Sequence, residues 1–292
     1  QLANMALAAW ESVTGIVFNR SPGASEPVHI SFDDNGSGAY STSTTSGGQI
    51  LASTVNVSID WLAGGSGFNS YSYQTYIHEI GHALGLGHAG NYNGIATYGE
   101  DNHYLNDSWQ ATVMSYFSQE ENTSVNASQA FIASPMIADI LAMQTLYGLT
   151  NLRSGNNTYG ETTNAGASYG VIADMLRDVS MRDDIAFTVF DRGGIDLLDL
   201  SRDSHNQHIT LLPGYSSSAY GLVGNISIAL GTVIEQVLTG RGNDFINGNS
   251  ANNLLSSGLG DDTLRGFAGN DLLYGAGGRD LMEGSTGNDV YV

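Results

Sequence analysis

Apolar residues recur at helical spacing near both ends of the first half of the chain. In residues 1–13 every third or fourth position is apolar, which predicts a helix that starts without a cap and ends at Gly15. Another helix is predicted near residue 140, with Ser134 as N-cap, Pro135 as its first residue and Gly148 at its end.

Between these helices, short apolar runs and alternating patterns predict strands. We expect them at Ile16–Phe18, Val28–Phe32, Gln49–Ser53 and Val55–Ile59. The polar stretches Tyr40–Gly48 and Gly90–Ala111 are expected to be loops. Together with a further helix that starts near Ser70 or Ser72, these elements predict an α+β unit for the first half of the chain.

Beyond Gly148 the signals for helices nearly vanish, and Gly, Asn and Asp dominate, so we expect an all-β region with strands near Phe187–Asp191 and Leu197–Leu200. From Thr239 to Val292 the sequence repeats every nine residues. The sixth position of each unit is acidic in all but one case: Asp244, Asn253, Asp262, Asp271, Asp280 and Asp289. The eighth position carries a large apolar or aromatic residue: Ile246, Leu255, Leu264, Leu273, Met282 and Tyr291.

This period matches the G-G-x-G-x-D-x-U-x calcium repeat of parallel β-rolls. Two units form one turn, the eighth position points inward, and turn carbonyls and carboxylates face calcium between turns. The candidate ligands are Gly240, Gly242, Asp244, Gly258, Gly260, Asp262, Gly269, Asp271, Gly278, Asp280, Gly287 and Asp289. We expect this half to unfold without calcium, and the second unit, with Ala251 and Asn253, to bind it most weakly.

The stretch YIHEIGHALGLGH at residues 76–88 carries the candidate chemistry. His78 and His82 lie four residues apart, so a helix places both imidazoles on one face. Gly85 allows the chain to turn back so that His88 becomes a third zinc ligand, and Glu79 is placed as general base for a metal-bound water. Chance placement would produce the extended three-His pattern with a probability of only about one in 60,000.

Composition narrows the functional classes. The formal net charge is −20, and all 9 basic residues are Arg. Such a surface disfavours nucleic acid and anionic membranes as partners. The chain has no Cys, which excludes disulfides and thiol chemistry, and no apolar run approaches the ~18 residues of a membrane span. Residues 1–25 do not resemble a signal peptide.

The three-His motif followed by Met114-Ser115-Tyr116 resembles the metzincin zinc proteases, and the nine-residue repeats single out the serralysin family. This resemblance covers nearly the whole chain. It implies one catalytic Zn²⁺ held by His78, His82, His88 and Tyr116, with Glu79 as base. It also implies that Tyr116 stabilises the oxyanion, and that Met114 forms an apolar floor beneath the metal.

Two further segments resemble structural calcium sites of that family. Their candidate ligands are Arg153, Gly155, Asn156, Asp191, Gly193, Gly194 and Asp196. Where the family usually has Asp and then Ser or Thr, this chain has Asn156 and Asn157, which predicts a weaker site or one filled through carbonyls. Several structural Ca²⁺ ions are therefore expected.

The resemblance implies a catalytic domain over 1–150 and a calcium-binding β-roll domain over 151–292. Peptide substrates would pair with an edge strand formed by Gln49, Ile50, Leu51, Ala52 and Ser53. We expect a monomeric, secreted bacterial endopeptidase exported without a signal peptide, with a proteinaceous inhibitor as a further candidate partner. Family members usually extend further at both ends, which favours a fragment, a processed form or a short relative.

Two alternatives remain open from the sequence. One is a non-catalytic, calcium-dependent extracellular binding or surface protein that keeps a relic zinc site. The other is a zinc hydrolase that acts on bonds other than peptide bonds. Intact Glu79 and Tyr116 argue against the relic, because a relic usually loses its base first.

Overall fold

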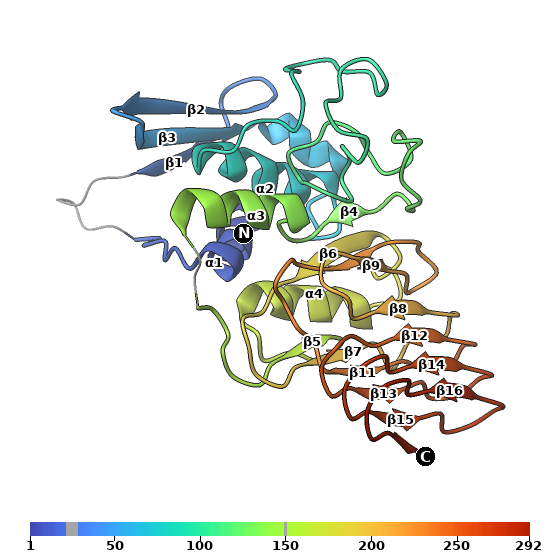
Figure 1. Cartoon of the computed structure of the whole chain (residues 1–292). Helices are drawn as coiled ribbons and strands as arrows, with labels where there is room; N and C mark the ends of the chain where they lie inside the picture. Colours follow the sequence, from blue (N-terminus) through green and yellow to red (C-terminus); the bar gives the residue numbers. More distant parts are fainter. Residues whose placement is uncertain (22–28, 149–150) are drawn as a thin grey trace. The chain divides into compact units, whose positions relative to one another are not determined.

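The computed structural model describes residues 1–21, 29–148 and 151–292 and divides into two compact units (Figure 1). The first unit comprises Gln1–Val125 and Phe131–Thr150, and the second comprises Asn126–Ala130 and Asn151–Val292. This division differs from the expected one because the short segment Asn126–Ala130 belongs to the second unit. Among the described residues, no helix is both long enough and apolar enough to cross a membrane.

The first unit combines three α-helices with a three-stranded sheet. Its elements are α1 (Leu2–Thr14), β1 (Ile30–Asp33), β2 (Ala39–Ser46), β3 (Gln49–Val57), the 3₁₀ helix η1 (Ile59–Gly64), α2 (Tyr71–Ala83), β4 (Phe131–Ile132) and α3 (Ile137–Tyr147). The predicted first helix is confirmed: it has no side-chain cap, and Gly15 ends it in the left-handed conformation. The indole nitrogen of Trp10 donates to the carbonyl of Ile77, which ties α1 to α2.

The sheet corrects several predictions about strands. The strand expected at Ile16–Phe18 is absent, and Val17 is 89% exposed. The loop expected over Tyr40–Gly48 is instead strand β2, which forms an antiparallel hairpin with β3. The two strands predicted from Gln49 onward are one continuous strand that ends at Val57, and Ile59 begins η1 instead. β2 escaped prediction because nearly all of its residues are polar and solvent-exposed, so it has no apolar face to produce alternation.

The position of β3 also contradicts its assignment as an edge strand. β3 lies between β1, with which it is parallel, and β2, so its Gln49–Ser53 segment is paired along the hairpin rather than free. Pairing partners are set by tertiary contacts that hydrophobic alternation does not encode. The two outer strands of this sheet are β1 and β2. Of the strand predicted at Val28–Phe32, residues 30–32 lie in β1, while Val28 is outside the described residues.

Helix α3 begins two residues later than predicted. Met136, not Ser134, is the N-cap, and the hydroxyl of Ser134 donates to the carbonyl of Pro135. The carboxylate of Asp139, at the third helical position, accepts from the backbone N–H of Met136 at 2.8 Å. Its negative charge suits the helix N-terminus. The predicted stop at Gly148 is confirmed.

The second unit is mainly β but contains one helix that the sequence analysis missed. α4 (Ala167–Arg177) buries Tyr169, Ile172 and Leu176, which have helical spacing. Gly166 and Gly170 obscured that pattern. The region is therefore not all-β. Three further strands form a small sheet in the order β6-β10-β9: β6 (Ile185–Val189), β9 (Ser216–Ser217) and β10 (Ile226–Ile228).

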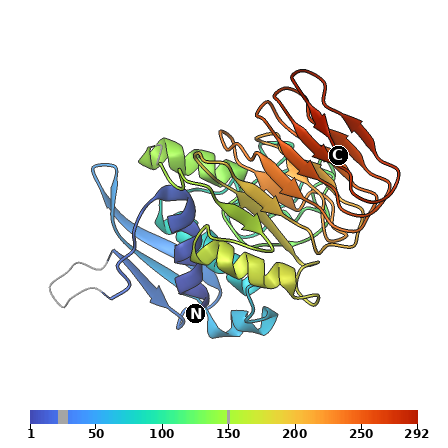
Figure 2. The same ribbon diagram turned by 90° about the horizontal axis from the view of Figure 1, so that it is seen from below.

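A coil of short parallel strands makes up the rest of the second unit (Figure 2). One six-stranded sheet contains β5 (Thr158–Gly160), β7 (Leu197–Asp199), β11 (Gln236–Leu238), β13 (Leu254–Ser256), β15 (Leu272–Tyr274) and β17 (Val290–Tyr291). The other, four-stranded, contains β8 (His208–Thr210), β12 (Phe245–Asn247), β14 (Thr263–Arg265) and β16 (Leu281–Glu283). In these sheets, neighbouring repeat strands are offset by two units: Phe245 pairs with Thr263 and Leu254 with Leu272.

The predicted inward column of apolar residues is present in the first four repeat units. Ile246, Leu255, Leu264 and Leu273 are fully buried. In the last turn Met282 is half-buried and Tyr291 is 51% exposed. The column also continues upstream of the repeats, through Tyr159, Leu198 and Val237, in register with Leu255.

Candidate active site and calcium-binding coil

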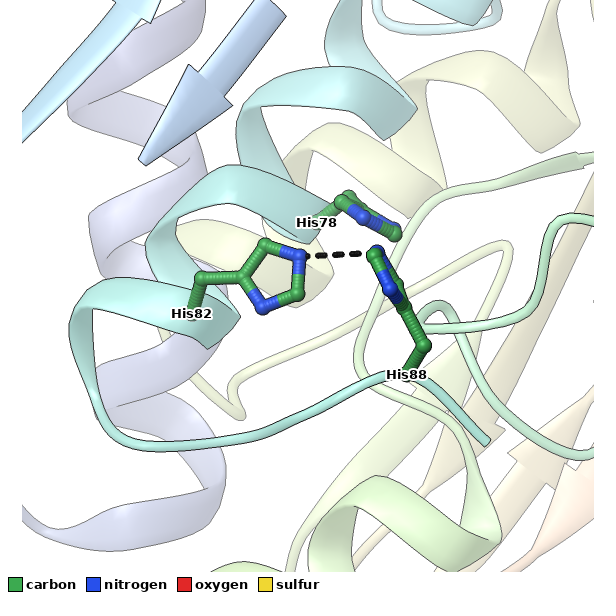
Figure 3. A group of neighbouring side chains, drawn as sticks. All are labelled: His78, His82 and His88. Atoms are coloured by element: carbon green, nitrogen blue, oxygen red, sulfur yellow. Dashed lines mark hydrogen bonds between the residues drawn. The ribbon is translucent and has the colours of Figure 1, made fainter. Parts of the chain in front are cut away.

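The three histidines of the motif converge. His78 and His82 project from the same face of α2, and their ring centres lie 4.7 Å apart. The chain then reverses at Gly85, which has a φ of 100°, and brings the ring of His88 to 4.6 Å from that of His82 (Figure 3). Ligand atoms from all three residues lie within 4.8 Å of one another.

Each imidazole is oriented by a backbone carbonyl. The Nδ1 atoms of His78, His82 and His88 donate to the carbonyls of Val113, Leu86 and Tyr92, each at 2.8 Å. A carbonyl can only accept, so the proton of each neutral ring lies on Nδ1 and Nε2 keeps its lone pair. Bonds of this kind fix the tautomer of metal-ligating histidines.

The facing nitrogens show that the site fits a cation. The Nε2 atoms of His82 and His88 lie 3.0 Å apart (Figure 3). Two lone pairs at this distance repel unless a positive charge lies beside them. Burial lowers the pKa of His78 to about 3, and burial also lowers the pKa values of His82 and His88, so protonation is a poor source of that charge. Zn²⁺ is bound by such nitrogen ligands, with one position open in catalytic sites.

Glu79 follows His78 on α2 and lines the same cleft as His78. Its side chain is buried, and Oε2 has no hydrogen-bond partner among the described residues. Burial raises the pKa of Glu79 to about 7. An unsatisfied buried carboxylate is costly, and such groups concentrate at functional sites. Its position and environment suit a general base.

Met114 and Tyr116 flank the metal site. Met114 is buried against α2, where a Cβ on Gly81 would lie 2.6 Å from its sulfur. The ring of Tyr116 lies 4.4 Å from that of His88, and its hydroxyl accepts from the N–H of Gly94 at 3.4 Å. The structure therefore brings both residues to the site, and the role of Tyr116 as a ligand stays a prediction.

His78, Glu79 and Tyr116 line a cleft of about 560 Å³ in the first unit. One wall comes from α2, another from the loop Asn93–Ala96, and a third from Gly38 and Ala39 at the start of β2. Trp61, Tyr71 and Trp109 form an aromatic row along it, with ring centres 6.1 and 5.9 Å apart. None of the predicted edge-strand residues Gln49–Ser53 lines the cleft.

Sequence reasoning missed Tyr92. Its carbonyl holds His88, its ring stacks on that of His88 at 5.4 Å, and its hydroxyl donates to the buried carboxylate of Asp107 at 3.1 Å. Desolvation raises the pKa of Tyr92 to about 12. No spacing rule marks a loop tyrosine as a partner of His88, so the sequence held no usable signal.

In the coil, the carboxylates of successive turns are stacked. The N–H of Asp244 donates to Oδ1 of Asp262, and the N–H of Asp262 donates to Oδ1 of Asp280. Asn253, Asp271 and Asp289 are connected in the same way on the other side. The Oδ2 atoms of Asp244, Asp262 and Asp271 are buried and have no hydrogen-bond partner within the described part of the chain.

Glycines in the turns of the coil lie very close to backbone carbonyls of the turn before. A Cβ on Gly260 would lie 1.8 Å from the carbonyl oxygen of Gly242, and Gly278 and Gly287 have equally close carbonyl neighbours. A Cβ on Gly240, Gly242, Gly258 or Gly269 would lie slightly farther, 2.0–2.3 Å, from a carbonyl oxygen of the turn before. Burial raises the pKa of Asp244 to about 6, and it also raises the pKa values of Asp262 and Asp271. Unpaired, crowded oxygens fit a hard cation such as Ca²⁺.

The two upstream segments of calcium candidates also lie together. A Cβ on Gly194 would meet the carbonyl of Gly155 at 2.4 Å, and Oδ1 of Asn156 accepts from the N–H of Ile195 at 3.0 Å. Asp191 accepts from the N–H of Gly193, and the guanidinium of Arg153 donates to the carbonyl of Phe190. These contacts place all seven candidates in one part of the second unit.

Asp196 has an acidic neighbour that the sequence analysis missed. Its N–H donates to Oε2 of Glu235 at 2.8 Å, and its own Oδ2 is buried without a partner. Burial, with the charges of Asp191 and Glu235, raises the pKa of Asp196 to about 7. Glu235 lies nine residues before Asp244, so the repeat period extended one unit upstream would have found it.

Comparison with known proteins identifies the family. Residues 149–292 match the model described as "Peptidase M10 serralysin C terminal". The chain is 45% identical over 195 residues to metallopeptidase AprA of Pseudomonas marginalis, a match that spans 64% of this chain and 39% of that protein. The chain is of the serralysin type. This confirms the resemblance inferred from its motifs.

Longer matches extend the relationship over most of this serralysin-type chain. A serralysin of Photorhabdus laumondii is 35% identical over 263 residues, which cover 87% of this chain and 53% of the relative. Serralysin C of Dickeya chrysanthemi is 36% identical over 257 residues, covering 84% and 52%. The chain therefore spans about half the length of the curated relatives it matches.

Proposed function

We propose that this chain is a zinc-dependent endopeptidase whose first unit is a metzincin-type catalytic unit. Calcium bound to the coil would stabilise the second unit. The observation that supports this function most strongly is the convergence of three imidazoles, one of which, His78, lines the same cleft as the buried carboxylate of Glu79. The serralysin-type relatives are named as metallopeptidases or serralysins, which agrees with it.

His78, His82 and His88 would hold the Zn²⁺. When bound, the metal supplies a Lewis acid that brings the pKa of water to about 7. Glu79 would accept the proton of the attacking water at Oε2 and pass it to the leaving amine. Tyr116 would serve as an additional ligand and, once released, donate its hydroxyl to the substrate carbonyl oxygen as that oxygen gains charge.

The substrate would be an extended peptide that pairs with β2 rather than β3. Gly38 and Ala39 at the start of β2 line the cleft, while no residue of Gln49–Ser53 does. In this mode, main-chain hydrogen bonds supply affinity whatever the substrate side chains are. We therefore infer that the enzyme accepts substrates of many sequences. Both β1 and β2 are outer strands, and the lining of the cleft supports the choice of β2.

We also propose that the protein acts outside the cell as a monomer. Its protein substrates, and a protein inhibitor that fills the same cleft, would be its partners. Ca²⁺ in the mM range outside cells would fill the coil. The orphaned carboxylate oxygens of Asp244, Asp262 and Asp271 support calcium binding.

Replacement of Glu79 tests the proposed chemistry. Glu79→Gln keeps the shape of the side chain but cannot accept a proton, so hydrolysis of casein or a quenched fluorescent peptide should fall by about 10²–10⁴-fold. Zinc content, measured by elemental analysis, should be unchanged because the three histidines remain. Incubation of the wild-type chain with a zinc chelator should also abolish hydrolysis.

Glu120→Gln is the matched control, because Glu120 is an exposed glutamate outside the cleft. Its activity should equal that of the wild type. Full activity in Glu79→Gln would reject the assigned base. A wild-type chain that binds zinc and calcium but cleaves no peptide would instead indicate the binding protein with a relic site.

A further inference from the structure

The peptide group between Val113 and Met114 is hydrogen-bonded at both ends. Its carbonyl oxygen, on Val113, accepts from Nδ1 of His78 at 2.8 Å. Its N–H, on Met114, donates to Oγ1 of Thr112 at 3.0 Å. His78 is therefore connected through one peptide group to a hydroxyl that lies outside the ring of zinc ligands.

The hydroxyl of Thr112 extends this chain to a buried carboxylate. It donates to Oδ1 of Asp139, on the first turn of α3. The other oxygen of Asp139 accepts from the N–H groups of Val113 and Met136, each at 2.8 Å. A carboxylate in this position only accepts, so every bond runs in one direction, from the imidazole to Asp139.

All members of this chain are shielded from water. Thr112, Met114 and Asp139 are exposed by 7%, 3% and 2%. Hydrogen bonds in such surroundings are electrostatically stronger than in water, and consecutive bonds polarise one another. A negative charge at one end makes the Thr112 oxygen, and then the Val113 carbonyl, a better acceptor for the imidazole proton.

We propose that Thr112 and Asp139 are positioning residues that act on His78 through the Val113–Met114 peptide group and increase the affinity of its Nε2 for Zn²⁺. They fix the tautomer and ring orientation of His78 and shift electron density toward the metal-binding nitrogen. Replacing a group that is hydrogen-bonded directly to a metal ligand typically lowers metal affinity by about 10- to 100-fold. We expect an effect of this order here. The inference rests on the proposed function, in that His78 is taken as a zinc ligand.

The test compares two substitutions at Thr112. Thr112→Val keeps the shape of the side chain but removes both the acceptor for Met114 and the donor to Asp139. Thr112→Ser keeps the hydroxyl. The dissociation constant for Zn²⁺ is measured by competition with a chromophoric chelator, with the full chain in calcium, so that the readout is independent of proteolysis.

We expect the valine variant to bind Zn²⁺ about 10-fold more weakly and the serine variant to stay within about 2-fold of the wild type. Thr145→Val is the matched control, because this threonine lies on α3 and donates its hydroxyl to the carbonyl of Leu141. It should leave zinc affinity unchanged. A purely structural role for Thr112 would lower the stability of the metal-free chain without changing the zinc dissociation constant.

Asp139→Asn provides a second route in case Thr112→Val fails to fold. Its amide presents N–H groups where the native residue only accepts, so zinc binding should weaken by a similar factor. Zinc affinity equal to that of the wild type in a folded Thr112→Val or Asp139→Asn variant would overturn the relay. A wild-type chain that binds zinc but cleaves no peptide would overturn the peptidase alone.

Discussion

At the scale of single residues, the candidate metal site depends on close packing around α2 that does not accommodate a larger side chain. Gly81 lies on α2 next to His82, and its missing side chain is what lets Met114 and Trp10 approach. The sequence motif marks this glycine only as an unspecified position between two histidines. Its importance follows from packing between segments that are distant in the chain.

Gly81→Ala should destabilise the first unit. The new Cβ would lie 2.6 Å from the sulfur of Met114 and 3.0 Å from Cζ2 of Trp10. Overpacking of this kind costs about 1–3 kcal/mol in the free energy of unfolding. Urea unfolding followed by tryptophan fluorescence would measure it.

Gly170→Ala is the opposite case and serves as control. Gly170 is in the interior of α4, and a Cβ there meets no atom within 4 Å. Because alanine has the better helix propensity, this change should raise the free energy of unfolding by about 0.5–1 kcal/mol. Equal effects of the two substitutions would contradict the packing argument.

Asp139 predicts a pH dependence of stability. Burial raises its pKa to about 6, above the value of about 4 expected in the unfolded chain. The folded state therefore holds the proton more tightly, and the stability contributed by this group is greatest below pH 4 and is lost as the pH rises through 6. Between pH 4.5 and 7.5 the loss should be about 2 kcal/mol.

The measurement compares urea unfolding of the metal-free wild type and of Asp139→Asn at these two pH values. The asparagine does not titrate, so the difference between the two chains isolates the carboxyl group. The free energy of unfolding of the wild type, relative to that of Asp139→Asn, should be higher at pH 4.5 than at pH 7.5. A difference that does not change with pH would show that Asp139 has an ordinary pKa.

At the scale of elements, the coil combines a narrow apolar column with stacked carboxylates. Each strand is only two or three residues long, and burial of one large side chain per strand is a small stabilising contribution. Carboxylates crowded in the turns oppose folding until a cation neutralises them. Because the apolar burial is small and the carboxylates repel one another, folding of the coil should depend on calcium.

Asp271→Asn should raise the calcium concentration needed to fold the coil. The amide oxygen can still accept from the N–H of Asn253, but the charge beside the buried Oδ2 position is lost. Since calcium affinity follows the number of charged ligands, the midpoint should increase about 10-fold. Calcium titration of the chelator-treated chain, followed by far-UV circular dichroism, measures that midpoint.

Asp183→Asn is the control for this substitution, because Asp183 is an exposed residue between α4 and β6. It removes the same charge from the second unit without touching the coil. Equal midpoints for Asp271→Asn and the wild type would show that Asp271 does not bind calcium.

At the scale of the whole molecule, two units with different sources of stability share one chain. The first packs large side chains such as Trp10, Tyr73 and Phe117 into a core. The second depends on repetition and on its acidic turns. The net charge of −20 is explained in part by the repeat aspartates, so charge indicates an ion requirement as well as solubility.

The sequence by itself determined the features that depend on local spacing. His78, Glu79 and His82 are fixed by helical periodicity, and the turn at Gly85 brings back His88. The nine-residue period fixed which repeat residues face inward and which face the turns. These assignments succeed because the interacting groups lie within one element or at one constant interval.

Only the tertiary structure decided which distant segments meet. It placed β2 rather than Gln49–Ser53 at the cleft, moved the start of α3 to Met136 and revealed the carboxylate of Asp139 behind Thr112. It also showed that the polar stretch over Tyr40–Gly48 forms a strand. Strand order and buried hydrogen-bond partners arise from contacts between residues far apart in sequence, which no local pattern of apolar and polar positions records.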